Sequence, residues 1–383
     1  MVACYRDFGL GTFVVRIDRY FHGLIILLLP YLSTLNIPSC RFPGLSCRFS
    51  FPGFIDEYEK PEYIKFKMDF SGVIVKIIYL KYFFGVLFIM FGTMPYISCT
   101  SYSNIINESY QRLEAYNVKT FDTEYGIMSY VDEGFGEAII ISHGIFGGYD
   151  QGYNNLYSIF GENHRKISVS RFGYPGSSLP QEPAPDKQAR VFLKLLDELQ
   201  IDKVFLIAAS AGGTAGIRFA LDYSDRLKGL ILLSSSVPSI PMTKKELGMA
   251  GPPKIILNDR LMLFSIRNFK GVFYSMFGSK NVPDEVFDNM LPVKPRRNGI
   301  IYDTEINNID MAVNFDDYRV ENLNIPILVI QAKDDPMVKY ENTEHFLKRV
   351  KAELLIYPDG GHLIIGHDIT DGIINFMEKN GNE

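Results

Sequence analysis

From about Asn104 onwards, short apolar runs alternate with longer segments in which apolar residues recur every three or four positions. Short runs rich in β-branched residues are typical of buried strands, whereas the longer spacing is typical of helices that cover a sheet. The first two strands are expected to pair antiparallel, and the alternation that follows predicts an α/β fold, with a mostly parallel central sheet and helices on both faces. The predicted strands are residues 118–121, 126–131, 138–142, 166–170, 204–208, 230–233, 327–331 and 354–357.

The helical spacing is clearest after Asp186, which is expected to cap a helix whose apolar face holds Phe192, Leu195, Leu196 and Leu199. The regular alternation stops between about residues 237 and 317, where prolines interrupt apolar helical stretches such as residues 255–277. An insertion of this size after a sheet strand predicts a helical cap. We therefore expect one large domain over residues 104–383 that carries this cap.

Residues 1–67 show no sustained hydrophobic period, and prolines are scattered among their polar and aromatic residues. Their apolar run at residues 23–31 is too short to cross a bilayer comfortably. We expect this extension either to be disordered or to lie upstream of the true translation start, for which Met68 is one alternative.

Residues 68–103 are different, because an uncharged and strongly apolar run occupies residues 82–94 and follows two lysines. The stretch 72–99 is long enough to anchor the chain in a membrane, and its basic start and apolar centre are also typical of a secretory signal. Residues 96–99 loosely resemble a bacterial lipoprotein cleavage box in which Cys99 would carry the lipid. A buried helix packed on the main domain is the other interpretation. We expect a membrane-associated or exported protein, with a cytoplasmic one as the alternative.

The composition is that of a globular protein of 383 residues, nearly half of them hydrophobic, with a net charge of −5. No basic stripe is present, so nucleic acid is not an expected partner. The four cysteines all lie in the first hundred residues, which leaves the predicted domain without a thiol nucleophile. The six histidines show no zinc-ligand spacing, and a metal site is not indicated.

The strand at residues 204–208 runs into Ala209-Ser210-Ala211-Gly212-Gly213 and then directly into a helical segment at residues 214–223. A serine among small residues between a strand and a helix is the arrangement that exposes a nucleophile on a strained turn. The motif departs from Gly-x-Ser-x-Gly, because Ala208 stands at the first glycine position. An ordinary strand-to-helix turn would show the same short pattern, so Ser210 needs partners elsewhere in the chain.

A serine nucleophile requires a base, and the base requires a carboxylate that orients it. His362 follows the last predicted strand through two glycines and is the predicted base, in preference to His367 at the start of the final helix. Asp335 follows the preceding strand and is the predicted carboxylate, with its neighbour Asp334 as the alternative. The order Ser210, acid, histidine is the one found in α/β sheet hydrolases.

The negative charge that forms on the attacked oxygen requires backbone N–H donors. Ala211, directly after the serine, is the first predicted donor, and Ile145 is the second. Ile145 belongs to the loop that follows the third predicted strand and reads His-Gly-Ile-Phe-Gly-Gly. We expect His143, Gly144 and Phe146 of this loop to border the substrate, with His143 shaping the loop and not acting as the base.

Over residues 118–380 the chain resembles the α/β-hydrolase superfamily, specifically its cap-bearing α/β-hydrolase-1 type. The resemblance implies a hydrolase that needs no metal and no cofactor, and Ser210 separates the chain from the dehalogenase and epoxide-hydrolase branches, which use aspartate there. The motifs that carry it are His143-Gly144, the segment from Arg171 to Ser178, the turn at Ser210, Asp334-Asp335-Pro336 and Gly360-Gly361-His362.

The expected reaction is attack by Ser210 on an ester or related acyl carbon, followed by release of the acyl group to water with His362 as base. Aromatic residues make the predicted cap apolar and favour a small hydrophobic substrate, as in a carboxylesterase. They are Phe264, Phe269, Phe273, Tyr274 and Phe277. Acyltransferase, C–C hydrolase and aminopeptidase activities remain open within the same fold, and a ligand-binding protein with slow or no catalysis is the alternative from another class.

The cysteine at position 99 gives the prediction of export a direct test. Mass analysis of the protein from its native membrane or culture fraction is expected to show cleavage or lipid attachment at Cys99. An intact, soluble chain that begins at Met1 would contradict it.

Overall fold

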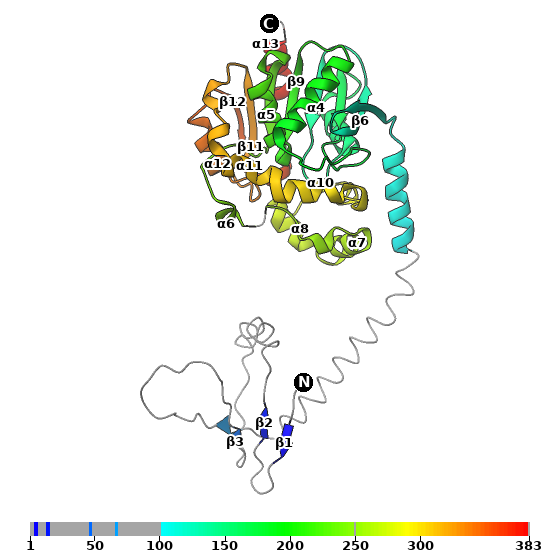
Figure 1. The fold of residues 1–383 in the computed structure, drawn as a ribbon, viewed down its shortest axis with the longest axis vertical. Coiled ribbons are helices and arrows are strands. Elements are labelled where there is room, and N and C mark those ends of the chain that lie inside the picture. Colours follow the sequence, from blue (N-terminus) through cyan, green and yellow to red (C-terminus); the bar gives the residue numbers. More distant parts are fainter. Residues whose placement is uncertain are drawn as a thin grey trace. The chain divides into compact units, whose positions relative to one another are not determined.

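The computed structural model describes residues 4–6, 13–15, 46–47, 66–67, 101–248 and 250–381. The chain divides into two compact units, Met1–Ser98 and Cys99–Glu383. In the first unit, β1 (Cys4–Arg6) pairs antiparallel with β2 (Phe13–Val15), and β3 (Ser46–Cys47) pairs antiparallel with β4 (Phe66–Lys67). All the other described elements belong to the second unit (Figure 1).

The predictions of an alternative start at Met68, of an anchor or signal at residues 72–99 and of a lipid on Cys99 lie outside the described residues. Among the helices of the described ranges, none combines the length and the apolar character that a membrane crossing requires. The predicted domain start at Asn104 falls inside a helix that includes residues 101–114.

The second unit is built on an eight-stranded sheet in the order β12-β11-β10-β9-β7-β8-β6-β5. Only the pairs β5–β6 and β6–β8 are antiparallel, so the prediction of a mostly parallel sheet is confirmed. β10 begins three residues earlier than predicted, because Lys228 and Gly229 interrupt the apolar run at an irregularity in the pairing with β9. The strands are β5 (Lys119–Thr123), β6 (Gly126–Glu133), β7 (Ala138–Ser142), β8 (Arg165–Val169), β9 (Val204–Ala209), β10 (Leu227–Leu233), β11 (Ile327–Ala332) and β12 (Glu353–Tyr357).

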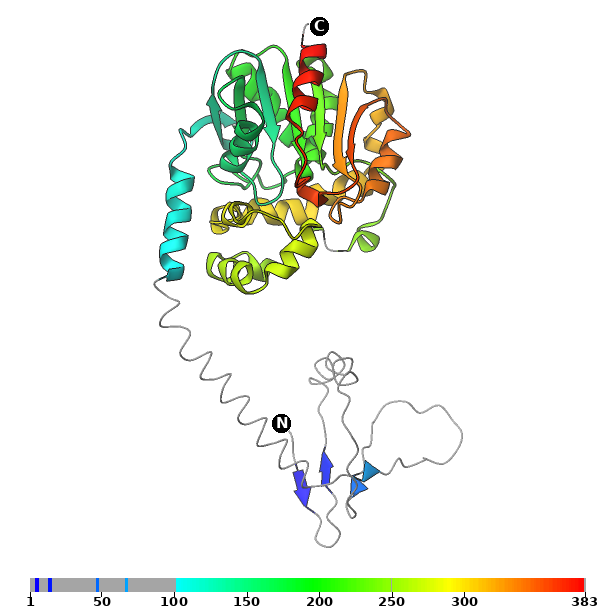
Figure 2. The same ribbon diagram turned by 180° about the vertical axis from the view of Figure 1, so that it is seen from behind.

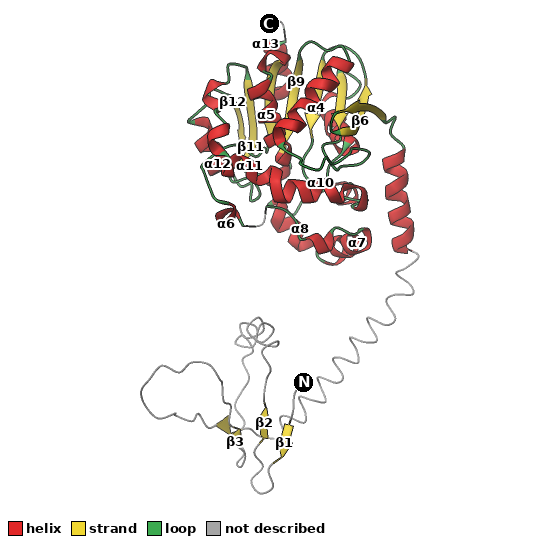
Figure 3. Ribbon diagram, viewed as in Figure 1, coloured by secondary structure: helices red, strands yellow, loops and turns green. Residues whose placement is uncertain are grey.

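Alternate side chains of each central strand enter two separate cores, one on each face of the sheet. Leu206 packs with the core on the side of α4 (Pro185–Glu198), α5 (Gly213–Asp222) and α12 (Tyr340–Leu347). Its neighbours Phe205 and Ile207 pack on the other side, with α3 (Tyr149–Phe160) and α13 (Thr370–Asn380). Figures 1 and 3 show α4 and α5 in front of the sheet, and Figure 2 shows α13 in front of it from behind.

The helix predicted after Asp186 is α4, and its first residue is Pro185. Proline is favoured there because its fixed φ angle suits a helix and its missing N–H would have no partner. Asp186 therefore lies in the first turn of the helix. The prediction that Asp186 caps the helix was wrong, because the N-cap residue is Ala184.

The segment between β10 and β11 is largely helical and lies along one end of the sheet (Figure 1). The predicted helical stretch 255–277 is divided into α7 and α8, because the chain turns at Phe269 with a non-helical conformation. The elements are α6 (Lys244–Leu247), η4 (Lys254–Ile256), α7 (Asp259–Asn268), α8 (Lys270–Phe277), α9 (Asp284–Asp288), η5 (Lys294–Arg296), α10 (Arg297–Tyr302), the π-helix η6 (Asp303–Asn307), α11 (Asn308–Val313), η7 (Phe315–Asp317) and η8 (Val320–Asn322).

A third apolar core, which we call the cap cluster, holds this segment together. It also takes in Phe146 and Tyr174 from loops at the end of the sheet. Its other buried members are Leu257, Met262, Leu263, Ile266, Phe273, Phe277, Val282, Phe287, Met290, Leu291, Val293 and Ile300.

A fully enclosed ion pair joins the cap segment to the loops of the sheet. Arg171, after β8, donates through both terminal nitrogens to the two carboxylate oxygens of Asp303 at 2.6 Å each. Tyr174 donates its hydroxyl to the same carboxylate at 2.5 Å, and Arg171 also donates to the carbonyl of His143 at 3.0 Å. The carboxylate of Asp303, from the cap, thus holds the Arg171 side chain, which in turn supports the loop after β7.

The helix that includes residues 101–114, which we call the N-terminal helix of the second unit, contacts both the cap segment and α3. Tyr110 donates to Asp259 of α7 at 3.0 Å, and Arg112 donates to the carbonyl of Asp288 at 2.9 Å. The carbonyl of Leu113 accepts the Tyr149 hydroxyl of α3 at 3.2 Å.

The approach of α5 to β9 explains the unusual alanine before the serine turn. A Cβ placed on Gly216 would lie 2.6 Å from the Cβ of Ala208, well inside contact distance. The methyl group that Ala208 adds at the first glycine position of the motif therefore occupies the space left by a glycine in the helix.

Replacement of Gly216 by alanine is expected to destabilise the fold by about 1–3 kcal/mol through overpacking, although alanine is the better helix former. The double variant Ala208→Gly/Gly216→Ala is expected to recover most of that loss, because it moves the methyl group from the strand to the helix. Urea unfolding of the four proteins of this cycle measures the coupling. Strictly additive effects would contradict the proposed contact.

Removal of the enclosed carboxylate by Asp303→Ala is expected to cost about 3–5 kcal/mol, because it leaves the Arg171 charge buried without a partner. The exposed pair Lys379–Glu353 provides the matched control, and Glu353→Ala is expected to cost about 1 kcal/mol or less. Urea midpoints of both variants test this difference, and equal shifts would show that the buried pair is not needed for stability.

Candidate active site

Ser210 lies at the sharp turn where β9 ends and η2 (Ser210–Gly212) begins, with a positive φ of 50°. Such a conformation is strained for a residue with a side chain and persists only where the surroundings impose it. A Cβ on Gly212 would lie 2.0 Å from the carbonyl oxygen of Ser142, and one on Gly213 would lie 2.2 Å from Ser235 Oγ. The small residues after the serine are therefore required by close neighbours.

The three side chains predicted to act together meet at this turn. His362 Nε2 lies 2.9 Å from Ser210 Oγ, and His362 Nδ1 lies 2.9 Å from Asp335 Oδ2. The other oxygen of Asp335 accepts the backbone N–H groups of Met337 at 2.8 Å and Val338 at 3.0 Å. The histidine and the aspartate are both buried, so their mutual orientation is held by the protein and not by solvent.

The alternative carboxylate has a different place. Asp334 Oδ1 accepts the backbone N–H of Gly361 at 2.9 Å and so supports the loop that carries His362. That loop passes directly under the cap segment, because a Cβ on Gly361 would lie 2.1 Å from the carbonyl oxygen of Phe277. His367 pairs with Asp359 at 2.7 Å on a more exposed part of the chain.

The loop after β7 passes beside the serine. A Cβ on Gly144 would lie 3.2 Å from the Cβ of Ser210, and Ala211 is buried next to it. Phe146 has a positive φ of 63° and is buried in the cap cluster, against which Ile145 packs while half-buried. The structure thus brings the loop, the serine and the cap together, and the donor roles of Ile145 and Ala211 stay predictions.

His143 is enclosed. Its Nδ1 donates to the Gly144 carbonyl at 2.8 Å, its Nε2 accepts the Arg171 backbone N–H at 3.1 Å, and its ring packs edge-on against Tyr174. Burial, and then the Arg171 cation, hold the pKa of His143 well below its ordinary value, so the ring is neutral. Both ring nitrogens are engaged inside the protein, so this histidine braces the loop, and its place at the border of the substrate stays a prediction.

Two residues near the serine, one from the cap and one from α5, were not anticipated. Asn307, at the end of the π-helix η6, donates its side-chain amide to the carbonyl of Ala211 at 2.8 Å. Thr214 of α5 donates to the carbonyl of Asn307 at 3.0 Å. Together with Asp303, Asn307 lies on one side of a short π-helix, an element often found at functional sites. Residues 303–308 are mostly polar, as in an exposed helix. The only sequence signal that could have identified Asp303 and Asn307 is their separation by four residues, which places them on one face of a helix.

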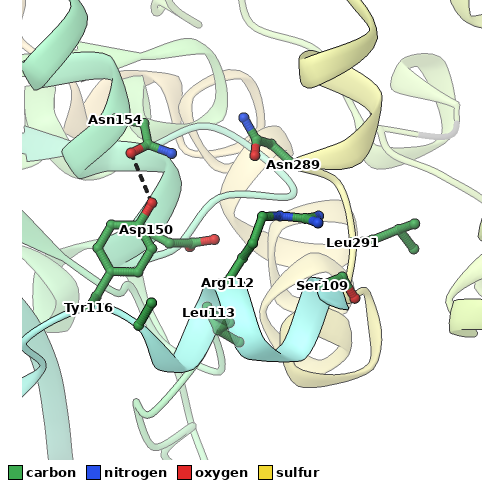
Figure 4. A pocket seen from close by; sticks show the side chains of 9 residues that line it. Ser109, Arg112, Leu113, Tyr116, Asp150, Asn154, Asn289 and Leu291 are labelled. Carbon is green, nitrogen blue, oxygen red and sulfur yellow. Dashed lines mark hydrogen bonds between the residues drawn. The ribbon is translucent and has the colours of Figure 1, made fainter. Parts of the chain in front are cut away.

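A separate pocket of about 270 Å³ opens between the N-terminal helix, α3 and the segment after α9 (Figure 4). Tyr116 donates to Asn154 at 2.8 Å on one side of it. Its lining does not include Ser210, Asp335 or His362, so this pocket is not where the serine would meet a substrate. The lining residues are Ser109, Arg112, Leu113, Ala115, Tyr116, Asp150, Asn154, Asn289 and Leu291.

Within the described ranges, no three histidine, cysteine or carboxylate side chains lie together in a way that could bind a metal ion.

Comparison with known proteins agrees with this architecture. The sequence matches the α/β-hydrolase fold family over residues 137–367. The uncharacterized hydrolase YcgS of Bacillus subtilis (strain 168) is 30% identical over 296 residues, which cover 68% of this chain and 99% of that protein. The 2-hydroxy-6-oxo-6-(2'-aminophenyl)hexa-2,4-dienoic acid hydrolase of Metapseudomonas resinovorans is 22% identical over 288 residues, covering 70% of this chain and 94% of that protein.

Among solved structures, an α/β-hydrolase fold protein from Nakamurella multipartita superposes with a TM-score of 0.54 at 21% identity, covering 69% of this chain and 98% of that one. Its likeness is evidence for the fold. The parallel sheet, the family match over most of the second unit and the nearly complete coverage of YcgS lead to one conclusion: this chain belongs to the α/β-hydrolase family.

Proposed function

We propose that this hydrolase is a serine hydrolase in which Ser210 is the nucleophile, His362 the general base and Asp335 the orienting carboxylate. The observation that carries the proposal is the continuous hydrogen-bond chain from Ser210 Oγ through both nitrogens of His362 to Asp335, with 2.9 Å at each step. Serine, base and carboxylate within hydrogen-bond reach are what activation of a hydroxyl requires.

The direction of the proton transfers follows from this chain. Asp335 accepts only, so His362 donates from Nδ1 and keeps Nε2 free to accept the serine proton. The serine oxygen then attacks the substrate carbonyl, and His362 returns the proton to the leaving group. Water attacks the acyl-enzyme by the same route, and the acid is released. The backbone N–H groups of Met337 and Val338 bind Oδ1 of Asp335 and so keep its other oxygen, Oδ2, aligned with the histidine throughout the cycle.

We place the oxyanion hole at the backbone N–H groups of Ala211 and Ile145. The approach of Gly144 to Ser210 supports this placement, because it puts the loop of Ile145 next to the attacking oxygen. Loss of one such donor typically raises the barrier by about 2.7–4 kcal/mol. Asn307 donates to the carbonyl of Ala211, in the peptide that follows the proposed donor, so the cap contributes to the position of this turn.

The proposed substrate is a small hydrophobic ester, as for a carboxylesterase. The apolar character of the cap cluster supports this, since that cluster meets the Ile145–Phe146 loop beside the serine. Two of the aromatic residues suggested for substrate contact, Phe264 and Phe269, are exposed, whereas Phe273 and Phe277 are buried in the cluster. A second candidate is hydrolysis of a carbon–carbon bond next to a ketone, because the Metapseudomonas relative is a hydrolase of an oxo-dienoic acid.

A fluorophosphonate probe, which labels activated serines, tests the nucleophile. The native chain is expected to be labelled and Ser210→Ala to remain unlabelled, with a loss of turnover of about 10⁶. A native chain that resists the probe but still binds a small ligand would favour the alternative of a binding protein.

The adjacent aspartates provide a matched pair of variants. Asp335→Asn is expected to reduce turnover about 10⁴-fold, because an amide at this position favours the wrong histidine tautomer. Asp334→Asn removes only support for the Gly361 N–H and is expected to retain most of the activity. Equal losses in the two variants would contradict the assignment of Asp335.

Substrate class is separated by comparing p-nitrophenyl esters of increasing acyl length with a 2-hydroxy-6-oxo-dienoate. Turnover of the esters, with a preference for one chain length, is expected. Efficient cleavage of the dienoate with negligible ester turnover would transfer the assignment to carbon–carbon hydrolysis while leaving the serine mechanism in place.

A further inference from the structure

The outer surface of the cap carries apolar side chains that the active site does not use. Five large apolar residues on η4, α7 and α8 are between 37% and 74% exposed. The rings of Phe264 and Phe269 contact each other edge to face across the α7–α8 junction, with centroids 5.9 Å apart. Leu261 lies one helical turn before the first ring, and Val272 lies one turn after the second. The fifth residue is Ile255.

Both faces of this helical pair are apolar, which is unusual. Met262, Leu263 and Ile266 of α7 are buried in the cap cluster, as are Phe273 and Phe277 of α8. A helix at a protein–water boundary normally has a polar outer face, and a contiguous exposed apolar patch marks a surface that meets something other than water. We call α7, α8 and their junction the outer hairpin of the cap.

The outer hairpin is also basic in an acidic protein. Its residues 259–277 contain three lysines and arginines and one aspartate, a formal charge of +2, whereas the whole chain carries −5. That aspartate, Asp259, is turned inward, where it accepts the backbone N–H groups of Val293 and Lys294 and the hydroxyl of Tyr110. Lys254 and Lys270 pair with carboxylates of the cap. Among the described residues, Arg260, Arg267 and Lys280 form no such ion pair.

The chain enters the described part of the second unit beside this surface. The guanidinium of Arg267 lies over the ring of Tyr102 at 5.3 Å, and Tyr102, Ile105 and Ile106 pack against the cap cluster. Figures 1 and 2 both show the start of the N-terminal helix at the same end of the domain as α7. Residues 95–100 join this helix to the uncharged apolar run at residues 82–94, the segment whose sequence suits a membrane.

We propose that the outer hairpin is a docking surface for an anionic lipid bilayer. Phe264, Phe269 and Val272 enter the headgroup region, while Arg260 lies against the lipid phosphates. Apolar residues combined with cations are what binding to an anionic membrane surface requires. The hairpin belongs to the cap, so docking would bring the cap to the lipid surface.

The full-length chain allows a site-specific test, because it contains no tryptophan. Phe269→Trp places one fluorophore on the hairpin. Phe135→Trp places one at a phenylalanine before β7 that is 78% exposed, against 53% for Phe269, and that lies at the opposite end of β7 from the serine. Vesicles of phosphatidylcholine, with and without phosphatidylglycerol, are titrated into each protein, and lipids with brominated acyl chains serve as quenchers. Thermal unfolding verifies that both variants are folded.

The Phe269→Trp emission is expected to shift to shorter wavelength and to be quenched by the brominated lipid in vesicles that contain phosphatidylglycerol. The Phe135→Trp emission is expected to stay unchanged. Because each reporter senses only its own position, a membrane attachment through residues 72–99 alone would leave both emissions unchanged and would overturn the proposal. Failure of the protein to bind vesicles would overturn it as well.

The cation is tested in the Phe269→Trp background. Arg260→Gln is expected to raise the amount of anionic lipid needed for half of the emission change about fivefold. Equal responses to neutral and anionic vesicles would contradict the electrostatic part of the proposal. An emission shift that grows with protein concentration in the absence of lipid would assign the hairpin to contact with a second copy of the chain.

Discussion

Where β9 ends, the backbone turns at Ser210 between two neighbours that leave it no room, the loop after β7 and the segment after β10. A Cβ on Gly144 would lie 3.2 Å from the Cβ of Ser210, and a Cβ on Gly212 would lie 2.0 Å from the carbonyl oxygen of Ser142. This closeness holds the serine in a strained conformation, with its hydroxyl 2.9 Å from His362 Nε2. The loops that carry Asp335 and His362 start at the ends of neighbouring parallel strands, so the same sheet edge delivers all three side chains.

The pair Ala208 and Gly216 shows how such a turn tolerates variation. The strand position carries a methyl group, and the facing helix position has none. The motif is defined by residues next to each other in the sequence, but the space available at its first position depends on Gly216 of α5, eight residues later. A departure from the motif is therefore harmless where the facing residue compensates. Small size at a pair of positions, and not glycine at one of them, is the physical requirement.

Buried charge links the cap to the site. The Asp303 carboxylate is shared by Arg171 and Tyr174, and the pKa of Arg171 rises because this carboxylate outweighs the effect of burial. Neither charge has water to replace a lost partner, so any movement of the π-helix away from the loop would expose an uncompensated ion in an apolar interior. The cap is thus held against the loop after β7 by charge, while its outer surface carries apolar and basic groups.

The sequence by itself determined the sheet, its two covered faces and the positions of Ser210 and His362 at strand ends. These features depend on short apolar runs and on small residues beside them, which are local signals. Asp334 and Asp335 could not be separated, because adjacent residues after one strand differ only in the direction that the loop gives them. The tertiary structure decided that Asp335 meets the histidine and that His143 is enclosed. It also showed that Asn307 reaches Ala211 from the cap and that α7 and α8 bury one apolar face and expose the other. These outcomes depend on contacts between segments far apart in the chain, and such contacts leave no periodic trace in either segment alone.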